Sequence, residues 1–297
     1  MKKLLPLLLL ILIGCSEPEP LNYEILVQRD GIFYLKDTNE IYSGPVFNIE
    51  GKSTGYIKKG KWNGEFEFYH SNGQLNGIGS YKDGDGSDLG DTGISRHGRV
   101  GQWKFYHSNG QLSNEKTYNN GKLDGPYKSY YENGQLSNED TWKDGKLDGP
   151  YKSYYENGQL KQEGTYNNGN SDGPYKSYYD NGQLYSEVTY KNGQRDGPFK
   201  SYYFNGQLER ETIYKNGNLD GPYKWYHDNG QLYSEETYKN GNLDGPYKSY
   251  HENGQLSNEK TFKDGKLDGP YKFYYENGQL EEVRTFKDGE LIDSKTY

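Results

Sequence analysis

The sequence predicts an all-β fold, an elongated single-layer antiparallel β-meander built from tandem hairpins of 24 residues. A proline recurs every 24 residues from Pro126 to Pro270, and an Asn-Gly dipeptide recurs at the same spacing. Each unit contains two turn dipeptides, such as Asn133-Gly134 and Asp144-Gly145, whose residues tolerate the positive φ of hairpin turns. Two turns per unit imply two strands per unit, and the fixed period indicates a repeat array.

Composition and charge narrow the class of protein. Hydrophobic residues are only 31% of the chain and 33 residues are tyrosine, so the usual aliphatic interior is missing. Low apolar content is typical of disorder, but aromatic residues at regular positions between turns favour a folded array. A formal net charge of −8 argues against nucleic acid as the main partner, because phosphate binding needs clustered Lys and Arg. The single cysteine excludes an intrachain disulfide framework and a Cys-based metal site.

The N-terminus predicts export. Residues 1–14 have a basic start and an apolar run too short to span a bilayer, the layout of a secretory signal. The run ends in Leu-Ile-Gly-Cys15, which resembles the lipobox of bacterial lipoproteins and implies a lipid anchor on Cys15; the alternative is a signal peptide with an accidental cysteine. Residues 15–22 then form the lipidated cysteine and a tether. The acidic stretch after the cysteine resembles the surface-export signals of some lipoproteins, which implies the outer membrane or cell surface more than the inner membrane.

The array begins irregularly. Residues 23–82 are interpreted as irregular early repeats, in which Asp30-Gly31 predicts a two-residue hairpin turn. Residues 83–98 exceed the repeat period and predict an inserted loop. Its Asp and Gly spacing leaves two alternatives, a weak calcium loop or a solvated loop, and the Glu that commonly completes a calcium loop does not follow. Residues 99–297 form the regular array.

Cross-strand pairing sets the register. A two-residue loop at Asn133-Gly134 pairs Tyr131 with Leu136 and Lys128 with Glu139, and the same Lys and Glu opposition recurs along the array. Pairing across the second turn sets Trp142 against Leu147 and Glu139 against Pro150, unless a bulge at Gly-Pro absorbs a surplus of two residues. Because proline is tolerated in sheets only at edges and bulges, we expect a kink at each Gly-Pro.

Strand alternation then divides the residues between two faces. One face concentrates the apolar area, and the other carries the Lys and Glu column. The first face contains Tyr127, Ser129, Tyr131, Leu136, Trp142 and Leu147, and the second contains Lys128, Tyr130, Glu139 and Thr141.

Three segments of the unit, Asn-Gly-Gln-Leu, Glu-x-Thr-Tyr and Lys-Asn-Gly-x-Leu-Asp-Gly-Pro-Tyr, resemble the bacterial variant of the MORN repeat (membrane occupation and recognition nexus), which includes a bacterial antitoxin family. The resemblance covers Tyr23 to the C-terminus. It implies an elongated hairpin array used for binding or scaffolding, without catalytic residues. Gly-Pro-Tyr stands where the eukaryotic pattern has Gly-x-Gly, so lipid binding by the eukaryotic proteins is not transferred.

The sequence predicts no enzyme. Nucleotide-binding loops, nucleophile elbows and His-Glu-x-x-His motifs do not occur in it. Four histidines, His70, His107, His227 and His251, stand in a column otherwise filled by tyrosine and are interpreted as aromatic replacements. We therefore expect no catalytic residue, no metal site and no cofactor.

Three hypotheses for function follow. The leading one is a cell-envelope scaffold that binds protein through its aromatic face, because Tyr is enriched at interfaces. The second is a carbohydrate or cell-wall binding module, and the third is an antitoxin or immunity protein, suggested only by the resemblance. Any single aromatic column has the alternative role of covering a sheet with no second layer. The predicted binding-face residues are Tyr127, Tyr131, Trp142, Tyr151, Tyr155, Tyr175, Tyr179 and Tyr223.

Overall fold

The computed structural model describes residues 18–47, 53–89 and 93–297. These residues form β-strands and turns with one short 3₁₀ helix, η1 (Tyr23–Ile25), so the predicted all-β class of tandem antiparallel hairpins is confirmed. Among the described residues, no helix has the length and apolar character needed to cross a bilayer. The predicted signal peptide and Cys15 lie outside the described residues. The chain divides into two compact units, residues 1–101 and 102–297, with β8 (Arg99–Tyr106) spanning the division.

The first unit contains short, irregular strands. The predicted hairpin at Asp30-Gly31 is confirmed, since both residues have positive φ, 49° and 72°, and join β2 to β3. Strands β4 to β7 pair antiparallel in order, with Glu67 opposite Ile78, whereas β1 pairs parallel to β4. The strands are β1 (Leu21–Asn22), β2 (Leu26–Arg29), β3 (Ile32–Leu35), β4 (Gly44–Phe47), β5 (Ser53–Lys58), β6 (Lys61–Tyr69) and β7 (Leu75–Gly84).

The core of the first unit is aromatic. The buried Trp62 ring lies 4.9 Å from that of Phe66, 5.0 Å from that of Tyr81 and 6.2 Å from that of Phe33. Stacked and edge-to-face aromatic pairs each contribute about 0.5–1.5 kcal/mol beyond the area that they bury. Aromatic packing therefore replaces the missing aliphatic interior in this unit.

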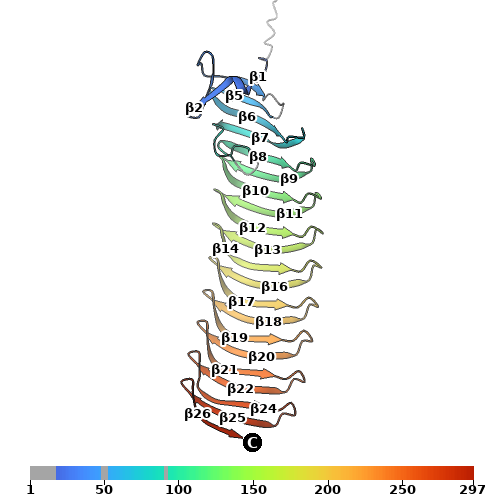
Figure 1. Cartoon of the computed structure of the whole chain (residues 1–297), viewed down its shortest axis with the longest axis vertical. Coiled ribbons are helices and arrows are strands. Elements are labelled where there is room, and N and C mark those ends of the chain that lie inside the picture. Colours follow the sequence, from blue (N-terminus) through green and yellow to red (C-terminus); the bar gives the residue numbers. More distant parts are fainter. Residues whose placement is uncertain (1–17, 48–52, 90–92) are drawn as a thin grey trace, which may run out of the picture. The chain divides into compact units, whose positions relative to one another are not determined.

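In the second unit each 24-residue repeat forms one hairpin, and the hairpins follow one another in chain order (Figure 1). Two of the longer strands are interrupted at the Asp before Gly-Pro, Asp172 or Asp268, and are numbered in two parts, β14 with β15 and β23 with β24. The strands that precede the loops are β10 (Lys122–Tyr130), β12 (Lys146–Tyr154), β14 (Asn170–Ser171), β15 (Gly173–Tyr178), β17 (Gln194–Tyr202), β19 (Asn218–Tyr226), β21 (Asn242–Tyr250), β23 (Lys266–Leu267) and β24 (Gly269–Tyr274). The strands that follow the loops are β9 (Leu112–Asn119), β11 (Leu136–Lys143), β13 (Leu160–Asn167), β16 (Leu184–Lys191), β18 (Leu208–Lys215), β20 (Leu232–Lys239), β22 (Leu256–Lys263) and β25 (Leu280–Lys287), and β26 (Glu290–Thr296) pairs with β25.

The two turns of a repeat differ. Asp144 and Gly145 both have positive φ, 48° and 81°, and form the expected two-residue turn. The prediction of a two-residue loop at Asn133-Gly134 is wrong. The Tyr131 amide donates to the Gln135 carbonyl at 2.8 Å, which closes a five-residue loop in which only Gly134 has positive φ.

This longer loop changes the pairing next to it. Leu136 lies opposite Tyr130, not opposite Tyr131 as predicted, and a bulge follows. Beyond the bulge the predicted register is correct, since Lys128 lies opposite Glu139. A type I turn with one left-handed glycine and a bulge is a common alternative to the two-residue hairpin.

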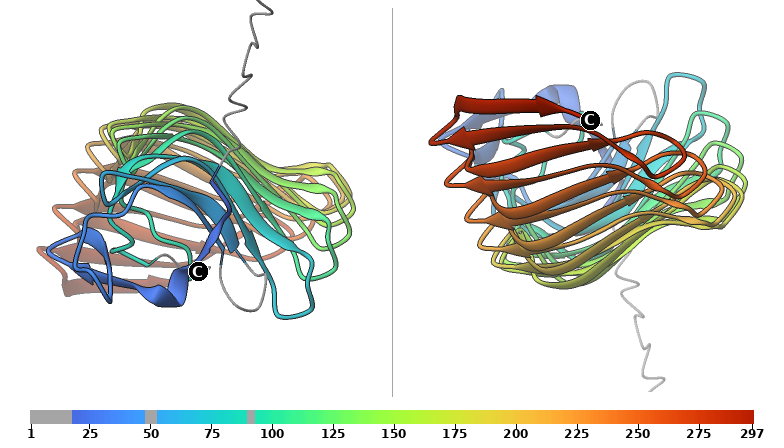
Figure 2. Two further views of the ribbon diagram at one scale, coloured as in Figure 1. Left: turned by 90° about the horizontal axis from the view of Figure 1, so that it is seen from above. Right: turned by 90° about the horizontal axis from the view of Figure 1, so that it is seen from below.

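The expected kink at Gly-Pro is confirmed. Trp142 lies opposite Leu147, but Glu139 lies opposite Lys152 and not opposite Pro150, so the strand segment between them holds two surplus residues. The bulge keeps neighbouring repeats 24 residues apart in register. Figure 2 shows the strands of the second unit bending along their length and the hairpins turning progressively about the stacking direction.

Candidate functional site

The pairing of β10 with β11 defines two faces of the second unit, because directly opposed residues lie on the same side of a sheet. We call one the aromatic face and the other the charged face. The predicted division is confirmed for the strand residues on the far side of the loop bulge, whereas Leu136, predicted on the first face, lies opposite Tyr130 at the bulge. The aromatic face of this hairpin contains Tyr127, Ser129, Asn138, Asp140 and Trp142, and the charged face contains Pro126, Lys128, Tyr130, Glu139 and Thr141.

The charged face is a continuous ladder. Each Glu lies opposite a Lys on both neighbouring strands, as Glu139 lies between Lys128 and Lys152. The Nζ to Oε1 distance is 3.7 Å for Lys128 and Glu139 and 2.8 Å for Lys272 and Glu259. These pairs are partly exposed, so each contributes only about 0–1 kcal/mol. The sequence alone predicts one Glu neighbour for each Lys, and the second neighbour follows only from the bulge at Gly-Pro.

Tyrosine hydroxyls complete this ladder. In most repeats the Tyr that ends the strand donates to the Glu of the preceding hairpin, as Tyr178 does to Glu163 at 2.7 Å. Burial, followed by this hydrogen bond to a carboxylate, raises the pKa of five of these tyrosines to about 12 and also raises the pKa of Tyr274. The donors are Tyr130, Tyr178, Tyr202, Tyr226, Tyr250 and Tyr274.

Shallow pockets repeat along the charged face. Five have cavity volumes of about 160 to 320 Å³, and each lies between the prolines of two successive repeats. The pocket between Pro174 and Pro198 is also lined by Glu187, Thr189 and Lys200. These pockets were not predicted from the sequence, although its Pro and Thr columns recur at the same spacing.

The aromatic face pairs its rings within each hairpin. Tyr175 and Tyr190 lie edge to face with ring centroids 5.7 Å apart, and Tyr151 and Tyr166 lie 5.5 Å apart. The structure places five of the predicted binding residues on this face, all of them partly buried. They are Tyr127, Trp142, Tyr151, Tyr175 and Tyr223.

The other three predicted residues, Tyr131, Tyr155 and Tyr179, lie in the five-residue loops. Each hydroxyl donates to a backbone carbonyl of the next repeat, as Tyr155 does to Tyr178 at 2.8 Å. These tyrosines therefore join neighbouring hairpins.

Histidines that stand at the position of Tyr131 in other repeats make the equivalent contact with a backbone carbonyl of the next repeat. Nε2 of His107 lies 3.0 Å from the Tyr130 carbonyl, and Nε2 of His251 lies 2.9 Å from the Tyr274 carbonyl. Because a carbonyl only accepts, Nε2 carries the proton in both. His227 differs, since within the described residues its Nε2 has no hydrogen-bond partner and its ring packs edge to face on Tyr233.

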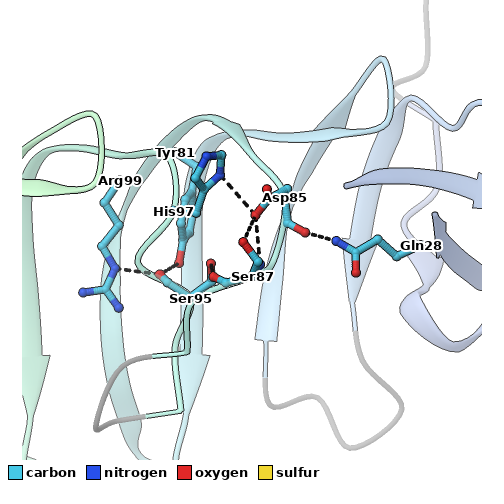
Figure 3. Close-up of polar contacts among 7 residues, drawn as sticks. All are labelled: Gln28, Tyr81, Asp85, Ser87, Ser95, His97 and Arg99. Carbon is cyan, nitrogen blue, oxygen red and sulfur yellow. Dashed lines mark hydrogen bonds and ion pairs between the residues drawn. The ribbon is translucent and has the colours of Figure 1, made fainter. Parts of the chain in front are cut away.

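The loop after β7 folds onto the first unit (Figure 3). The Tyr81 hydroxyl and Arg99 Nε donate to the Ser95 carbonyl at 2.6 and 2.7 Å, and Ser95 and Arg99 are buried. The second part of this loop is therefore buried, whereas Ser87, Asp88 and Leu89 in its Asp- and Gly-rich start are exposed. The described residues contain no group of three or more His, Cys, Asp or Glu side chains that is arranged to hold a metal ion.

Asp85 anchors the start of the loop. Its Oδ1 accepts from the Ser87 amide at 2.9 Å and lies 3.1 Å from His97 Nδ1, while Gln28 donates to its backbone carbonyl. Burial acts to raise the pKa of Asp85, but the Ser87 hydrogen bonds and the charges of His97 and Lys61 outweigh it and lower the pKa. These contacts give Asp85 a structural role in this loop.

Asp140 is a buried carboxyl on the aromatic face. Burial raises its pKa to about 6, although Trp142 Nε1 donates to it and the Lys116 charge acts in the opposite direction. Between about pH 4 and pH 6 the folded chain therefore holds a proton that the unfolded chain has lost. It follows that Asp140 makes the free energy of unfolding fall as the pH rises through this window.

We expect Asp140→Asn, which keeps an acceptor for Trp142, to raise the free energy of unfolding by about 1–2 kcal/mol at neutral pH and to leave it nearly unchanged at pH 4. Urea denaturation at both pH values measures the difference. Asp144→Asn is the control, because Asn already occupies the equivalent turn positions at Asn120 and Asn168. An equal change in the free energy of unfolding at both pH values would contradict the raised pKa of Asp140.

The repeats share the same residue at some positions and differ in residue type at others. On the charged face, the position of Lys128 holds Lys in all eight repeats from Lys104 to Lys272. The position of Tyr130 likewise holds Tyr in all eight repeats from Tyr106 to Tyr274. On the aromatic face, the position of Asp140 holds seven residue types in eight repeats. They are Lys116, Asp140, Gly164, Val188, Thr212, Glu236, Lys260 and Arg284.

The sequence and the structure were compared with known proteins. The family model described as MORN repeat variant matches nine segments, residues 62–83, 99–120, 123–144, 147–168, 171–192, 195–216, 219–240, 243–264 and 267–288. No curated protein matches the sequence.

Two solved structures show weak likeness. The crystal structure of TcdB2-TccC3-Cdc42 is 11% identical over 84% of this chain and 17% of that chain, with a TM-score of 0.17. A porin-like protein from Bacteroides uniformis ATCC 8492 is 11% identical over 82% of this chain and 88% of that chain, with a TM-score of 0.16. At TM-scores this low, neither structure informs the function of this chain.

Proposed function

Because the nine matched repeats cover more than half of the chain, this protein belongs to the MORN repeat variant family, and we propose that it is a non-enzymatic scaffold that binds a protein partner through its aromatic face. The observation that carries the proposal is the difference between the faces. On the aromatic face the position of Asp140, between constant ring columns, varies from repeat to repeat, whereas the Lys and Tyr positions of the charged face are constant. A partner without a regular repeat is recognised by side chains that differ along the array.

Contacts within the charged face are sufficient to explain why its residues are constant. Its Lys, Glu and Tyr side chains bind one another across successive strands, as Tyr226 and Lys224 both contact Glu211. Groups that already satisfy one another have less to offer a ligand, because binding must first break those contacts. Constancy on this face therefore follows from the ladder itself.

A protein partner also fits the aromatic face better than a regular glycan. A polymer of identical sugars needs the same contacts at every repeat, whereas the position between the rings changes from Lys116 to Asp140 to Gly164 in three successive repeats. The rings are packed edge to face on each other, as Tyr151 is on Tyr166, which leaves fewer open ring faces for a sugar to stack on. A cell-wall glycan remains the competing ligand in the test below.

The binding test uses charge reversals at two variable positions of the aromatic face. We expect the full chain to bind solubilised envelope protein saturably, and Glu236→Lys with Lys260→Glu to weaken that binding about tenfold or more. Lys224→Gln on the charged face is the control and should leave binding unchanged. Saturable binding to purified peptidoglycan that these reversals do not affect would reject the protein-binding role.

The proposed location is the cell envelope, at the outer membrane or cell surface, through a lipid on Cys15. The support is the lipobox-like sequence that ends at this single cysteine. We expect the parent chain to fractionate with membranes and to take up labelled palmitate, and Cys15→Ser to lose the label and appear in the soluble fraction. Membrane association that survives Cys15→Ser, without label in the parent, would reject the anchor.

A further inference from the structure

Hairpins 173–244 depart from the rest of the array at exposed positions. Trp225 stands where the neighbouring repeats have Ser201 and Ser249, and Phe204 stands where they have Asp180 and Asp228. Tyr185 and Tyr233 share a third position, which other repeats fill with Ser, Lys or Glu. Large aromatic side chains have thus replaced small or charged ones in three consecutive repeats.

These side chains form two ring clusters on neighbouring hairpins. Tyr179 contacts Tyr185 and Phe204 with ring centroids 5.1 and 5.2 Å apart. In the other cluster, the Tyr233 ring lies 5.0 Å from that of Trp225 and 5.1 Å from that of His227.

Arg210 lies beside the cluster that contains Trp225. It lies directly opposite Trp225 on the adjacent strand, and its Nε contacts Ser201 Oγ at 3.3 Å and Glu209 Oε2 at 3.6 Å. Burial acts to lower the pKa of Arg210, but hydrogen bonding to Tyr223 and the nearby charges, including that of Tyr185, raise it. We call Tyr185, Phe204, Arg210, Trp225 and Tyr233 the aromatic patch.

The exposure of the patch is inconsistent with a purely structural role. Phe204 is 58% exposed, Tyr185 42%, Trp225 40% and Tyr233 38%, whereas Phe199 in the ring column of the same face is 9% exposed. Trp, Tyr and Arg are the residues most enriched among those that dominate binding energy at protein interfaces. Exposed apolar clusters on a folded chain mark interaction sites.

The row of loop positions that contains Phe204 is acidic. One carboxylate per repeat stands exposed in the hairpin loops, and Phe204 interrupts this row between Asp180 and Asp228. Successive loops are two strands apart, which is about 9–10 Å. The other members of the row are Glu132, Glu156, Glu252 and Glu276.

We propose that the aromatic patch is the principal docking site for the partner, and that the partner is a protein presenting an apolar pocket flanked by Lys and Arg side chains. Phe204 and Trp225 enter the pocket, and the loop carboxylates on either side pair with the flanking cations. This inference rests on the proposed function, because it locates the partner on one part of the aromatic face. The loop carboxylates contribute mainly to orientation and to the rate of association.

Site-specific photo-crosslinking tests the position and the chemistry of the partner together. Phe204→benzoylphenylalanine is introduced in the full chain in the producing cell, and the crosslinked peptide is sequenced by mass spectrometry. We expect one partner protein, joined through an apolar segment with Lys or Arg nearby. The controls are Glu156→benzoylphenylalanine and Glu252→benzoylphenylalanine, equivalent loop positions that should give little or none of this product.

Several outcomes would overturn the inference: equal crosslinking from all three positions, a product with a second copy of this chain, an acidic contact segment, or no product from position 204. The affinity for the identified partner then measures how much the aromatic patch contributes to binding. Phe204→Glu with Trp225→Ser restores residues that other repeats already contain, so the hairpins should fold. We expect these changes to weaken binding about 30-fold or more.

Salt and the earlier reversals separate the two proposals. Raising the salt from about 50 mM to about 500 mM should slow association with the parent chain, because the loop carboxylates are exposed and screened. If Phe204→Glu with Trp225→Ser binds like the parent while Glu236→Lys with Lys260→Glu does not, the patch is rejected and the protein-binding function stands. If neither pair weakens binding, both proposals fail.

Discussion

Phe199→Ala is expected to lower the free energy of unfolding by about 3 kcal/mol, the lower end for removing a buried phenyl ring. Phe199 is 9% exposed, packs edge to face on Tyr214 with ring centroids 5.9 Å apart, and lies beneath the guanidinium groups of Arg195 and Arg210. A single-layer sheet has no second layer that could close over the resulting cavity. Urea denaturation measures the loss.

Phe204→Glu is the matched control for Phe199→Ala. Phe204 lies in an exposed loop, and Glu occupies its position in several repeats, so we expect a change within about 0.5 kcal/mol. Hydrogen exchange should also show faster opening of β16 to β19 in Phe199→Ala, because a repeat array unfolds locally. Equal losses for the two variants would mean that the ring column contributes no more stability than the loop.

Gly149→Ala is expected to cost about 2–3 kcal/mol through the backbone of the Gly-Pro kink. Gly149 has φ +126°, a region that residues with a Cβ rarely adopt, and an added Cβ would lie 3.2 Å from Thr141 Cβ. Strained backbone of this kind costs about 1–3 kcal/mol, and crowding by Thr141 adds to it.

Gly173 separates the two contributions. It has φ +104°, and an added Cβ there would meet no atom within 4 Å. Gly173→Ala should therefore show the backbone strain alone and cost about 1–2 kcal/mol. Thermal unfolding of both variants measures the difference, and a Gly173→Ala loss as large as that of Gly149→Ala would show that Thr141 yields without cost.

The candidate site was partly predictable. The eight predicted aromatic residues divide between two environments, since Tyr127 and Tyr151 lie on the aromatic face and Tyr131 and Tyr155 lie in loops bonded to the next repeat. The aromatic patch was not predicted, although its signal was present as departures from the repeat. Phe204 and Trp225 differ from the residues at the same positions of the neighbouring repeats, and their exposure distinguishes them from packing residues.

The sequence by itself determined the period, the all-β class, the turn at Asp144-Gly145 and the Lys128 and Glu139 register, because these depend on contacts within one repeat. The tertiary structure decided features that depend on contacts between repeats. Tyr131 donates to the carbonyl of Tyr154 on the following hairpin, which accompanies the five-residue loop, and the bulge at Gly-Pro brings each Glu between two lysines. A turn dipeptide encodes local backbone preference, but a hydrogen bond between repeats forms only after they stack.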